Sequence, residues 1–297
     1  MSVNAPQADM TEFSPPASGD WVVRGPTISG AQFDFFRKLA LQSAGISIPD
    51  FKRSMVHRRI LKRLMALNIN SFDDYIILLN DERGATEIEF FVNALTTNKT
   101  SFFRESHHFD HLAKVAIPEF QASALTTGKR QLRIWSAGCS SGPEPYSIAI
   151  TLADHLPQLS SWDAKILATD IDTEIVQRAS IGIYSPAEIE DVDSLTRRRH
   201  FSDLENGHWG VANELRKLVV FNQLNLHGEW PMQKKFDAIF CRNVIIYFDK
   251  PAQRLLFDKF ADVMKQDAFL YIGHSESLFR VTDRFEPIGQ NIYRKVA

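Results

Sequence analysis

The residues best suited to chemistry follow a short apolar run that ends at Gly138, in a turn before a predicted helix. α/β folds bind nucleotide-like ligands in such turns. The turn departs from G-x-G-x-x-G because Ser140 and Pro143 stand at its second and third glycine positions, and it has no Lys for a phosphate loop. Glu144, at the helix start, would repel phosphate. The pattern indicates a nucleoside ligand with a positive ammonium group and no phosphate, such as S-adenosylmethionine.

Two further strand ends carry side chains that suit a nucleoside. Asp170 ends the apolar run 165–170, and a carboxylate there can accept hydrogen bonds from both ribose hydroxyls. Asn225 lies at the end of the run 218–226, where its amide could read an adenine edge. Each signal also has a structural reading, because Asp caps helices and Asn forms turns. The combination favours the nucleoside site.

These strand ends need a sheet that brings them to one edge. From residue 132 onward, strand-like apolar runs alternate with helical patterns. The strand-like runs are 132–138, 165–170, 218–226, 236–243 and 268–275, and residues 285–296 resemble a hairpin. The helical patterns are 145–156, 173–180 and 251–265, the last with Pro251 in its first turn. The alternation predicts an α/β fold with a mostly parallel sheet between helices. The polar residues 183–216 predict an inserted subdomain with a small antiparallel sheet.

The first third of the chain has a helical pattern. Phe33 and Phe36 begin a helix that Gly45 is placed to end, and Asp50 and Ser71 are placed to cap the next two. The further predicted helices are 51–67, 71–80, 84–95 and, longer, around 107–120. We predict a flexible tail over 1–29, a helical domain over 30–97 and a second domain over 98–297.

Composition excludes several classes of protein. The 297 residues include 34 Lys and Arg against 36 Asp and Glu, so the net charge of -2 does not indicate a nucleic-acid-binding surface. No apolar run approaches the ~18 residues of a membrane span, and we expect no direct membrane insertion. The first 20 residues have no secretory signal pattern, and two cysteines suit a reducing compartment. We therefore expect a cytoplasmic protein.

Several longer segments resemble one known family, the chemotaxis-receptor glutamate O-methyltransferases (CheR). The segments are 94–109, 136–149, 168–179, 236–250 and 271–279. The most specific are T-T-N-x-T-x-F-F-R-E and F-C-R-N-V-x-I-Y-F. The resemblance covers most of residues 31–297. It implies a class I, Rossmann-like methyltransferase domain with a small inserted β-subdomain, preceded by an all-α domain.

The resemblance also implies an activity and a set of site residues. Such an enzyme transfers a methyl group from S-adenosyl-L-methionine to glutamates on the cytoplasmic helices of chemoreceptors, and releases S-adenosyl-L-homocysteine. The implied cofactor site consists of Asn98, Thr100, Arg104, Gly138, Glu144, Asp170, Asn225, Leu226, Cys241 and Arg242. The residues implied nearest the methyl group are Arg104, Arg242 and Tyr247.

Ester formation fits these residue types. A glutamate, with a pKa near 4.3, is already ionised at neutral pH and needs no general base. Desolvation favours the protonated acid, and a nearby Arg242 or Arg104 would oppose that. Arg104 is implied for the methionine carboxylate of the cofactor, and Tyr247 could orient the nucleophile. As isolated residues, Arg104 and Tyr247 could equally be a surface cation and a packing residue.

Other chemistry has weaker support. Val-Ile-Ile-Tyr follows Asn243 without the prolines of the D/N-P-P-Y/F run of nitrogen methyltransferases. His107, His108 and His111 share helical spacing, but without paired acids or Cys we expect them to be solvated or packed, with no metal. Cys139 and Cys241 are expected at neighbouring strand ends near the pocket, as apolar fillers or as oxidation-sensitive thiols.

A run of cations in the second helical segment suggests a partner surface. The residues are Lys52, Arg53, Arg59, Lys62 and Arg63, most of which can share a helical face. A solvated face is the ordinary reading. A receptor helix rich in glutamate would suit the patch better than nucleic acid, because aromatic platforms are not interleaved. The short turn 202–211 favours an enzyme that does not depend on a receptor tether.

Three functions remain open from sequence. The first is receptor glutamate methylation by a monomer. The second is methylation of a small molecule or RNA by the same fold. The third is a non-catalytic module that senses S-adenosylmethionine and docks a signalling partner.

Overall fold

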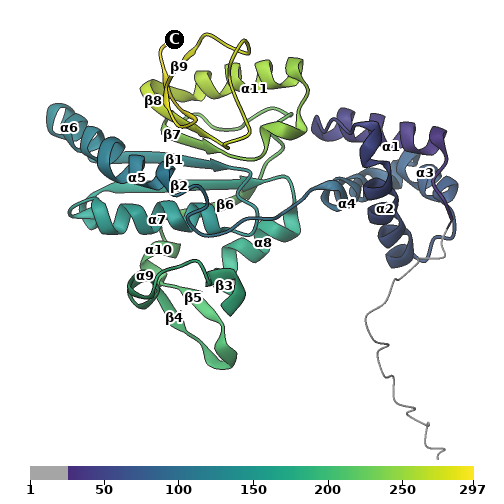
Figure 1. Cartoon of the computed structure of the whole chain (residues 1–297), viewed down its shortest axis with the longest axis horizontal. Helices are drawn as coiled ribbons and strands as arrows, with labels where there is room; N and C mark the ends of the chain where they lie inside the picture. Colours follow the sequence, from purple (N-terminus) through teal and green to yellow (C-terminus); the bar gives the residue numbers. More distant parts are fainter. Residues whose placement is uncertain (1–25) are drawn as a thin grey trace, which may run out of the picture.

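The computed structural model describes residues 26–297, which form a helical domain beside an α/β domain (Figure 1). Most of the predicted tail, residues 1–25, lies outside the described residues. The described structure begins before the predicted boundary. Ile28 is buried in the helical core, and the Ser29 hydroxyl accepts the Gln32 N–H at 3.2 Å to cap the first helix.

The helical domain is built around aromatic side chains. Its elements are α1 (Gly30–Ala44), the 3-10 turn η1 (Asp50–Lys52), α2 (Arg53–Leu67), α3 (Phe72–Asn80), the 3-10 turn η2 (Glu82–Gly84) and α4 (Ala85–Leu95). Phe36 is fully buried, and its ring centroid lies 6.1 Å from that of Tyr75 and 5.8 Å from that of Phe91. The helical spacing of apolar residues thus produces one core shared by α1, α3 and α4.

The predicted helix ends are correct in two of three cases. Gly45 ends α1 in the left-handed conformation, and the Ser71 hydroxyl accepts the Asp74 N–H at 3.1 Å to cap α3. The Asp50 cap was wrong. Asp50 begins the turn η1 and its carboxylate accepts a hydrogen bond from Arg37 at 2.7 Å, so an ion pair takes the place of the cap.

The α/β domain contains the predicted, mostly parallel sheet. The helices before the sheet are α5 (His107–His111), the π-helical turn η3 (Leu112–Ala116) and α6 (Ile117–Thr127). The sheet strands are β1 (Gln131–Ala137), β2 (Asp163–Asp170), β6 (Val219–Gln223), β7 (Phe236–Cys241), β8 (Met264–Ile272), β9 (Phe285–Gly289) and β10 (Ile292–Lys295). The helices between them include α7 (Pro143–His155), the 3-10 turn η4 (Leu159–Ser161), α8 (Thr173–Ile181) and α11 (Lys250–Val263).

The strand order β6-β2-β1-β7-β8-β10-β9 brings the functional strand ends together. β1 pairs in parallel with β2 and β7, β2 with β6, and β7 with β8. The last two strands form the predicted antiparallel hairpin, β9 with β10. The C-terminal ends of β6, β2, β1 and β7 therefore lie at one edge of the sheet.

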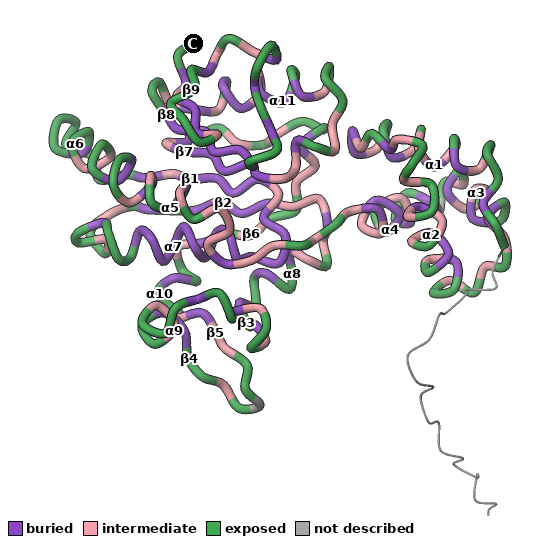
Figure 2. The backbone as a smooth tube through the Cα atoms, in the orientation of Figure 1, coloured by how far each residue is buried: buried purple, intermediate pink, exposed green. Residues whose placement is uncertain are grey.

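Both faces of the sheet are covered, which explains the continuous apolar runs (Figure 2). Successive residues of β1 alternate between the two faces. Ile134 packs with residues of α7 on one face, and Trp135 packs with Phe260 of α11 on the other. The central strands are buried along most of their length, so they form a rigid support for the loops at their ends.

The segment 183–216 forms the expected inserted subdomain, which projects from the sheet (Figure 1). Its elements are β3 (Ile183–Tyr184), the 3-10 turn η5 (Pro186–Ile189), α9 (Ser194–His200), β4 (Phe201–Asp203), the 3-10 turn η6 (Glu205–Gly207), β5 (Trp209–Val211) and α10 (Asn213–Arg216). The strands pair antiparallel in the order β3-β5-β4. Among the described residues, no helix has the length and apolar character needed to cross a bilayer.

Candidate active site

A cleft lies between the C-terminal ends of the central strands and the helical domain. Its free space, including the part open to solvent, is about 990 Å³. It is lined by Ala44, Ile46, Leu95, Thr96, Thr97, Asn98, Lys99, Thr100, Ser101, Arg104, Gly138, Ser140, Glu144, Asp170, Ile171, Leu224, Asn225, Leu226, Arg242, Asn243, Val244, Tyr247 and Phe248. All the sequence-predicted cofactor residues except Cys241 line this cleft.

The turn after β1 is held tightly against its neighbours. The backbone N–H groups of Gly138 and Cys139 donate to the Thr169 carbonyl at 2.7 and 2.8 Å. A Cβ at Gly138 would lie 2.3 Å from Cγ2 of Val244, in the loop after β7, and the backbone φ is +85°. Glycine is therefore required here by both space and conformation. The two loops consequently form one continuous wall.

Asp170 is fixed by backbone donors at the end of β2. Its Oδ2 accepts the Ser140 N–H at 2.8 Å, and its Oδ1 accepts the Asp172 N–H at 3.1 Å. Burial raises the pKa of Asp170, and these hydrogen bonds act in the opposite direction. A carboxylate has about four lone-pair sites, so it keeps capacity for hydroxyl donors in the cleft.

Glu144 and Arg242 form a buried pair in the cleft wall. Arg242 Nη1 lies 3.1 Å from Glu144 Oε2, and the Ser136 hydroxyl donates to Glu144 Oε1 at 2.7 Å. Burial raises the pKa of Glu144, while Arg242 favours its ionised form. Arg242 also donates to the Arg104 carbonyl. Its positive charge is thus satisfied within the protein.

Glu105 forms an ion pair with the other side of the Arg242 guanidinium. Its Oε2 lies 3.3 Å from Arg242 Nη2, and its Oε1 lies 2.8 Å from His274 Nδ1. Burial would raise the pKa of Glu105, but the His274 hydrogen bond and the Arg242 charge outweigh it and lower the pKa to about 2. Glu105 is therefore a firmly ionised link between the loops after β7 and β8.

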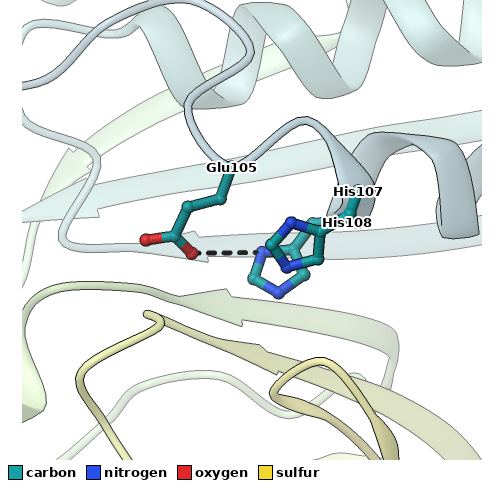
Figure 3. Close-up of side chains that lie close together, drawn as sticks. All are labelled: Glu105, His107 and His108. Atoms are coloured by element: carbon teal, nitrogen blue, oxygen red, sulfur yellow. Dashed lines mark ion pairs between the residues drawn. The ribbon is translucent and has the colours of Figure 1, made fainter.

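The histidine cluster packs against this network (Figure 3). His108 Nδ1 lies 3.6 Å from Glu105 Oε2, and burial and the charge of Arg242 lower the pKa of His108 to about 3. The ligand atoms of Glu105, His107 and His108 lie within 4.8 Å of one another. Arg242 already supplies the positive charge beside Glu105, so this cluster does not by itself indicate a bound metal cation. His111 contacts the Tyr271 hydroxyl at 3.0 Å, which is a packed role.

Arg104, Tyr247, Asn98 and Thr100 reach the cleft from two sides. Within residues 26–297, the Arg104 guanidinium has one hydrogen bond, from Nη1 to the Lys99 carbonyl at 3.2 Å. The Asn98 side chain donates to Asp172 Oδ2 at 2.8 Å. Tyr247 ends the 3-10 turn η7 (Ile245–Tyr247) after β7. Arg104 thus offers more unused donor capacity than Arg242.

Asn225 lines the cleft and also bonds to the protein, whereas Cys241 does not line the cleft. The Asn225 amide donates to the Ser43 carbonyl of α1 at 2.7 Å, and its oxygen accepts the His227 N–H at 2.9 Å. The amide therefore links the two domains. The neighbouring Leu226 lines the cleft with an apolar side chain. Cys241 is fully buried in the core on the α11 side and is absent from the cleft lining.

The two cysteines lie at the ends of neighbouring strands as expected, Cys139 just after β1 and Cys241 at the end of β7, but they face opposite sides of the sheet. Cys139 packs in the core on the α7 side, and Cys241 packs in the core on the α11 side. Burial raises the pKa of both thiols well above its usual range. These surroundings support the apolar-filler interpretation.

The predicted basic face of α2 divides into paired and exposed cations. Arg59 donates to the carbonyls of Leu95 and Thr96 at 2.5 and 2.6 Å. Arg63 forms a bidentate pair with Glu87 at 2.6 Å. Neither guanidinium is therefore a free charge, because each stabilises the helical domain.

The remaining cations of this face are more accessible. Arg53 is exposed, although it donates to the Ile28 carbonyl at 2.7 Å. Lys62 is exposed and has no ion pair with any residue in 26–297. The Lys52 ammonium lies 5.5 Å from the centroid of the Tyr247 ring.

Sequence reasoning missed the contribution of the helical domain to the cleft. Ala44 and Ile46, which flank Gly45 after α1, line it together with Leu95 and Thr96. Apolar residues beside a helix-ending glycine have no signature in sequence, because only domain docking brings them to the strand ends. Glu105 was part of a recognised motif but had no assigned role.

The cleft suits S-adenosylmethionine. The Asp170 and Glu144 carboxylates can accept hydrogen bonds from the hydroxyl and ammonium groups of this cofactor. Arg104 can bind its carboxylate. Ile46, Leu226 and Val244 supply apolar surface for a base. A mostly parallel sheet with this cleft at its strand ends defines the class of Rossmann-like, nucleoside-binding proteins.

Comparisons with known proteins identify the family within this class. Residues 98–294 match the family model described as "CheR methyltransferase, SAM binding domain", and residues 31–96 match "CheR methyltransferase, all-alpha domain". The chain therefore belongs to the CheR methyltransferase family.

Curated relatives agree along nearly their whole length. A probable chemotaxis protein methyltransferase of Rhizobium etli is 40% identical over 255 residues, which cover 84% of this chain and 94% of the relative. The chemotaxis protein methyltransferase of Salmonella typhimurium is 40% identical over 271 residues, covering 90% of each chain. The Escherichia coli K12 protein of the same name is also 40% identical over 271 residues, covering 90% of this chain and 91% of the relative.

These matches confirm the predicted family, fold class, cofactor and activity. The protein is a chemotaxis protein methyltransferase, that is, a protein-glutamate O-methyltransferase that uses S-adenosylmethionine to methylate chemoreceptors.

Proposed function

We propose that methyl transfer takes place beside Tyr247, and that the receptor helix reaches this point along the exposed cations of α2. The observation that carries the proposal is the position of Lys52. Its ammonium lies 5.5 Å from the centroid of the Tyr247 ring, and Tyr247 lines the cleft. The basic face of the helical domain and the reaction site are therefore adjacent.

We assign the cofactor-binding roles from the chemistry of the cleft wall. Asp170 binds the ribose hydroxyls, and Glu144 faces the ammonium group. Arg104 binds the carboxylate of the methionine part, because its guanidinium keeps free donors. Leu226 and Val244 cover the base. When bound, S-adenosylmethionine supplies a methyl group that is attached to a positively charged sulfonium. S-adenosylhomocysteine is the leaving group, and it is a good one because it is neutral at sulfur.

The protein orients the acceptor and excludes water. The receptor carboxylate is already ionised and must lie in line with the bond that breaks. The Tyr247 hydroxyl donates a hydrogen bond to one carboxylate oxygen and leaves the other to attack. Arg242 is held by Glu144 and Glu105, so we assign it to positioning of the wall. No proton has to be removed during transfer.

The docking surface consists of Lys52, Arg53, Arg58 and Lys62. Arg53, Arg58 and Lys62 are exposed. Their positive charge complements a receptor helix that carries several glutamates. We propose that the enzyme acts as a monomer in the cytoplasm, on the cytoplasmic helices of the receptor. The short connection 204–208 between β4 and β5 favours docking without a receptor tether.

Labelled methyl transfer to purified receptor cytoplasmic fragments tests this function. We expect the fragment to become labelled and alkali to release the label, because methyl esters hydrolyse in alkali and methylated amides do not. A fragment with its acceptor glutamates replaced by Ala is the control and should stay unlabelled. Cofactor binding without transfer would instead indicate a sensing module. Alkali-stable label would indicate nitrogen methylation and overturn the proposal.

A further inference from the structure

Glu276 presents a buried carboxylate to the backbone of the cleft wall. It lies after β8 and is 5% exposed. Its Oε1 accepts the N–H groups of Ile245 at 2.8 Å and Ile246 at 3.3 Å. Its Oε2 accepts the N–H groups of Gly273 at 2.6 Å and Asn243 at 3.0 Å. One side chain thus satisfies four backbone donors.

Three of these four donors belong to the loop after β7, which carries Tyr247 and forms part of the cleft wall. Residues 242–248 follow β7, and most of them line the cleft, including Arg242 and Tyr247. Asn243 adopts a left-handed conformation with φ at 60°, which an L residue rarely keeps without support. The loop turns away from the strand at this point, so its own backbone ladder cannot bond these N–H groups.

The residues around Glu276 pack closely against its turn. A Cβ added to Gly273 would lie 2.7 Å from the Asn243 amide nitrogen Nδ2 and 2.9 Å from Glu276 Oε2. The Asn291 side chain donates to the carbonyls of Gly273 and Glu276 at 2.7 and 3.0 Å. The turn that carries the Glu276 carboxylate is therefore also held by the Asn291 side chain.

We propose that Glu276 is a positioning residue for methyl transfer. It holds the loop after β7 so that Tyr247 points into the cleft at the distance that the reaction needs. This inference rests on the proposed role of Tyr247. Glu276 itself does not line the cleft, so it acts through the loop and does not touch the substrate.

A carboxylate is required because every partner is a donor. Glutamine has the same shape, but its NH₂ group would face two backbone N–H groups, which are also donors. Aspartate keeps both acceptor oxygens but is one methylene shorter. Glu276→Gln should therefore disturb the loop more than a change of charge at the surface, and Glu276→Asp should retain part of the function.

The first measurement is hydrogen exchange of the loop backbone. In the wild-type enzyme we expect slow exchange at Asn243, Ile245 and Ile246. Glu276→Gln should speed exchange there and leave β8 unchanged. The control is Glu286→Gln, which makes the same chemical change at an exposed position on β9 and should alter neither segment. Fast exchange of the three amides in the wild type would overturn the inference without any activity measurement.

The second measurement separates positioning from general stability. Glu276→Gln should lower kcat by about 10-fold, similar to Tyr247→Phe, because small misplacements of reacting groups are costly. Affinity for S-adenosylhomocysteine should fall less than kcat, because Val244 is the one base contact proposed from this loop while Asp170, Glu144 and Arg104 lie outside it. Glu276→Asp should recover part of kcat. Equal losses in kcat and in S-adenosylhomocysteine affinity would show a merely structural role. If Glu276→Gln does not fold, the losses in kcat and in S-adenosylhomocysteine affinity are compared for Glu276→Asp instead.

A double-mutant cycle with Tyr247→Phe distinguishes this inference from the proposed function. If Glu276 acts through Tyr247, Glu276→Gln should cost much less turnover in the Tyr247→Phe background than in the wild type. Fully additive losses would overturn the inference. If Tyr247→Phe alone has no effect on kcat, the role of Tyr247 fails, while the hydrogen exchange result still decides whether Glu276 holds the loop.

Discussion

Charged side chains in the cleft wall and on α2 have opposite surroundings. The Arg242 side chain is 2% exposed and lies between Glu144 and Glu105. Lys62 on α2 is exposed and has no ion pair within residues 26–297. A buried charge that loses its partner is expensive, whereas an exposed one is screened by water. The cleft charges therefore maintain geometry, and the exposed charges are available to a partner.

α2 itself shows the same contrast on a smaller scale. Arg63 is paired with Glu87, whose carboxylate also accepts the Tyr75 hydroxyl at 2.7 Å. Reversing the charge of Arg63 or Arg59 would damage the helical domain and, through Leu95 and Thr96, the cleft. These two residues are therefore poor probes of receptor docking, although they belong to the same basic run.

The largest effect should come from breaking the buried pair. Arg242→Met leaves Glu144 and Glu105 without their cation, and we expect a loss of about 3–5 kcal/mol in the free energy of unfolding. Affinity for S-adenosylhomocysteine should fall with it. Urea denaturation and calorimetric titration measure the two effects.

The matched control is Lys62→Met, the same kind of change on the exposed face. It should alter the free energy of unfolding by less than about 0.5 kcal/mol. If the two variants unfolded at the same urea concentration, the contrast between the two regions would not hold.

An intermediate effect is expected at Tyr247. Tyr247→Phe removes the hydroxyl but keeps the ring against Lys52, so we expect kcat to fall by about 10-fold with cofactor affinity almost unchanged. Steady-state methylation of receptor fragments and titration with S-adenosylhomocysteine separate the two. Loss of S-adenosylhomocysteine binding would assign Tyr247 to the cofactor site and remove its role at the acceptor.

The smallest effect is expected on the exposed face of α2. The double variant Arg58→Glu and Lys62→Glu, at two exposed positions, should raise KM for the receptor fragment several-fold at low salt and leave kcat and stability nearly unchanged. Because exposed charges are screened, the difference from wild type should shrink as salt increases. A KM that equals the wild-type value at low salt would exclude this face from docking.

The sequence by itself determined the elements and most of the cleft. The apolar runs predicted the strands of the α/β domain, and Gly138, Glu144 and Asp170 stand where the sheet brings its strand ends together. This succeeds because parallel strands place their C-terminal ends at one edge whatever loops join them. The specific motifs around Arg104 and Arg242 were sufficient to identify the family.

Only the tertiary structure decided which charges are free. Arg59 and Lys62 are indistinguishable as members of a basic run, but one is bonded to carbonyls at the end of α4 and the other faces solvent. Cys241 was implied for the cofactor site, but the fold buries its side chain in the core on the α11 side, outside the cleft lining. Pairing and burial depend on residues distant in the chain, so local spacing cannot specify them.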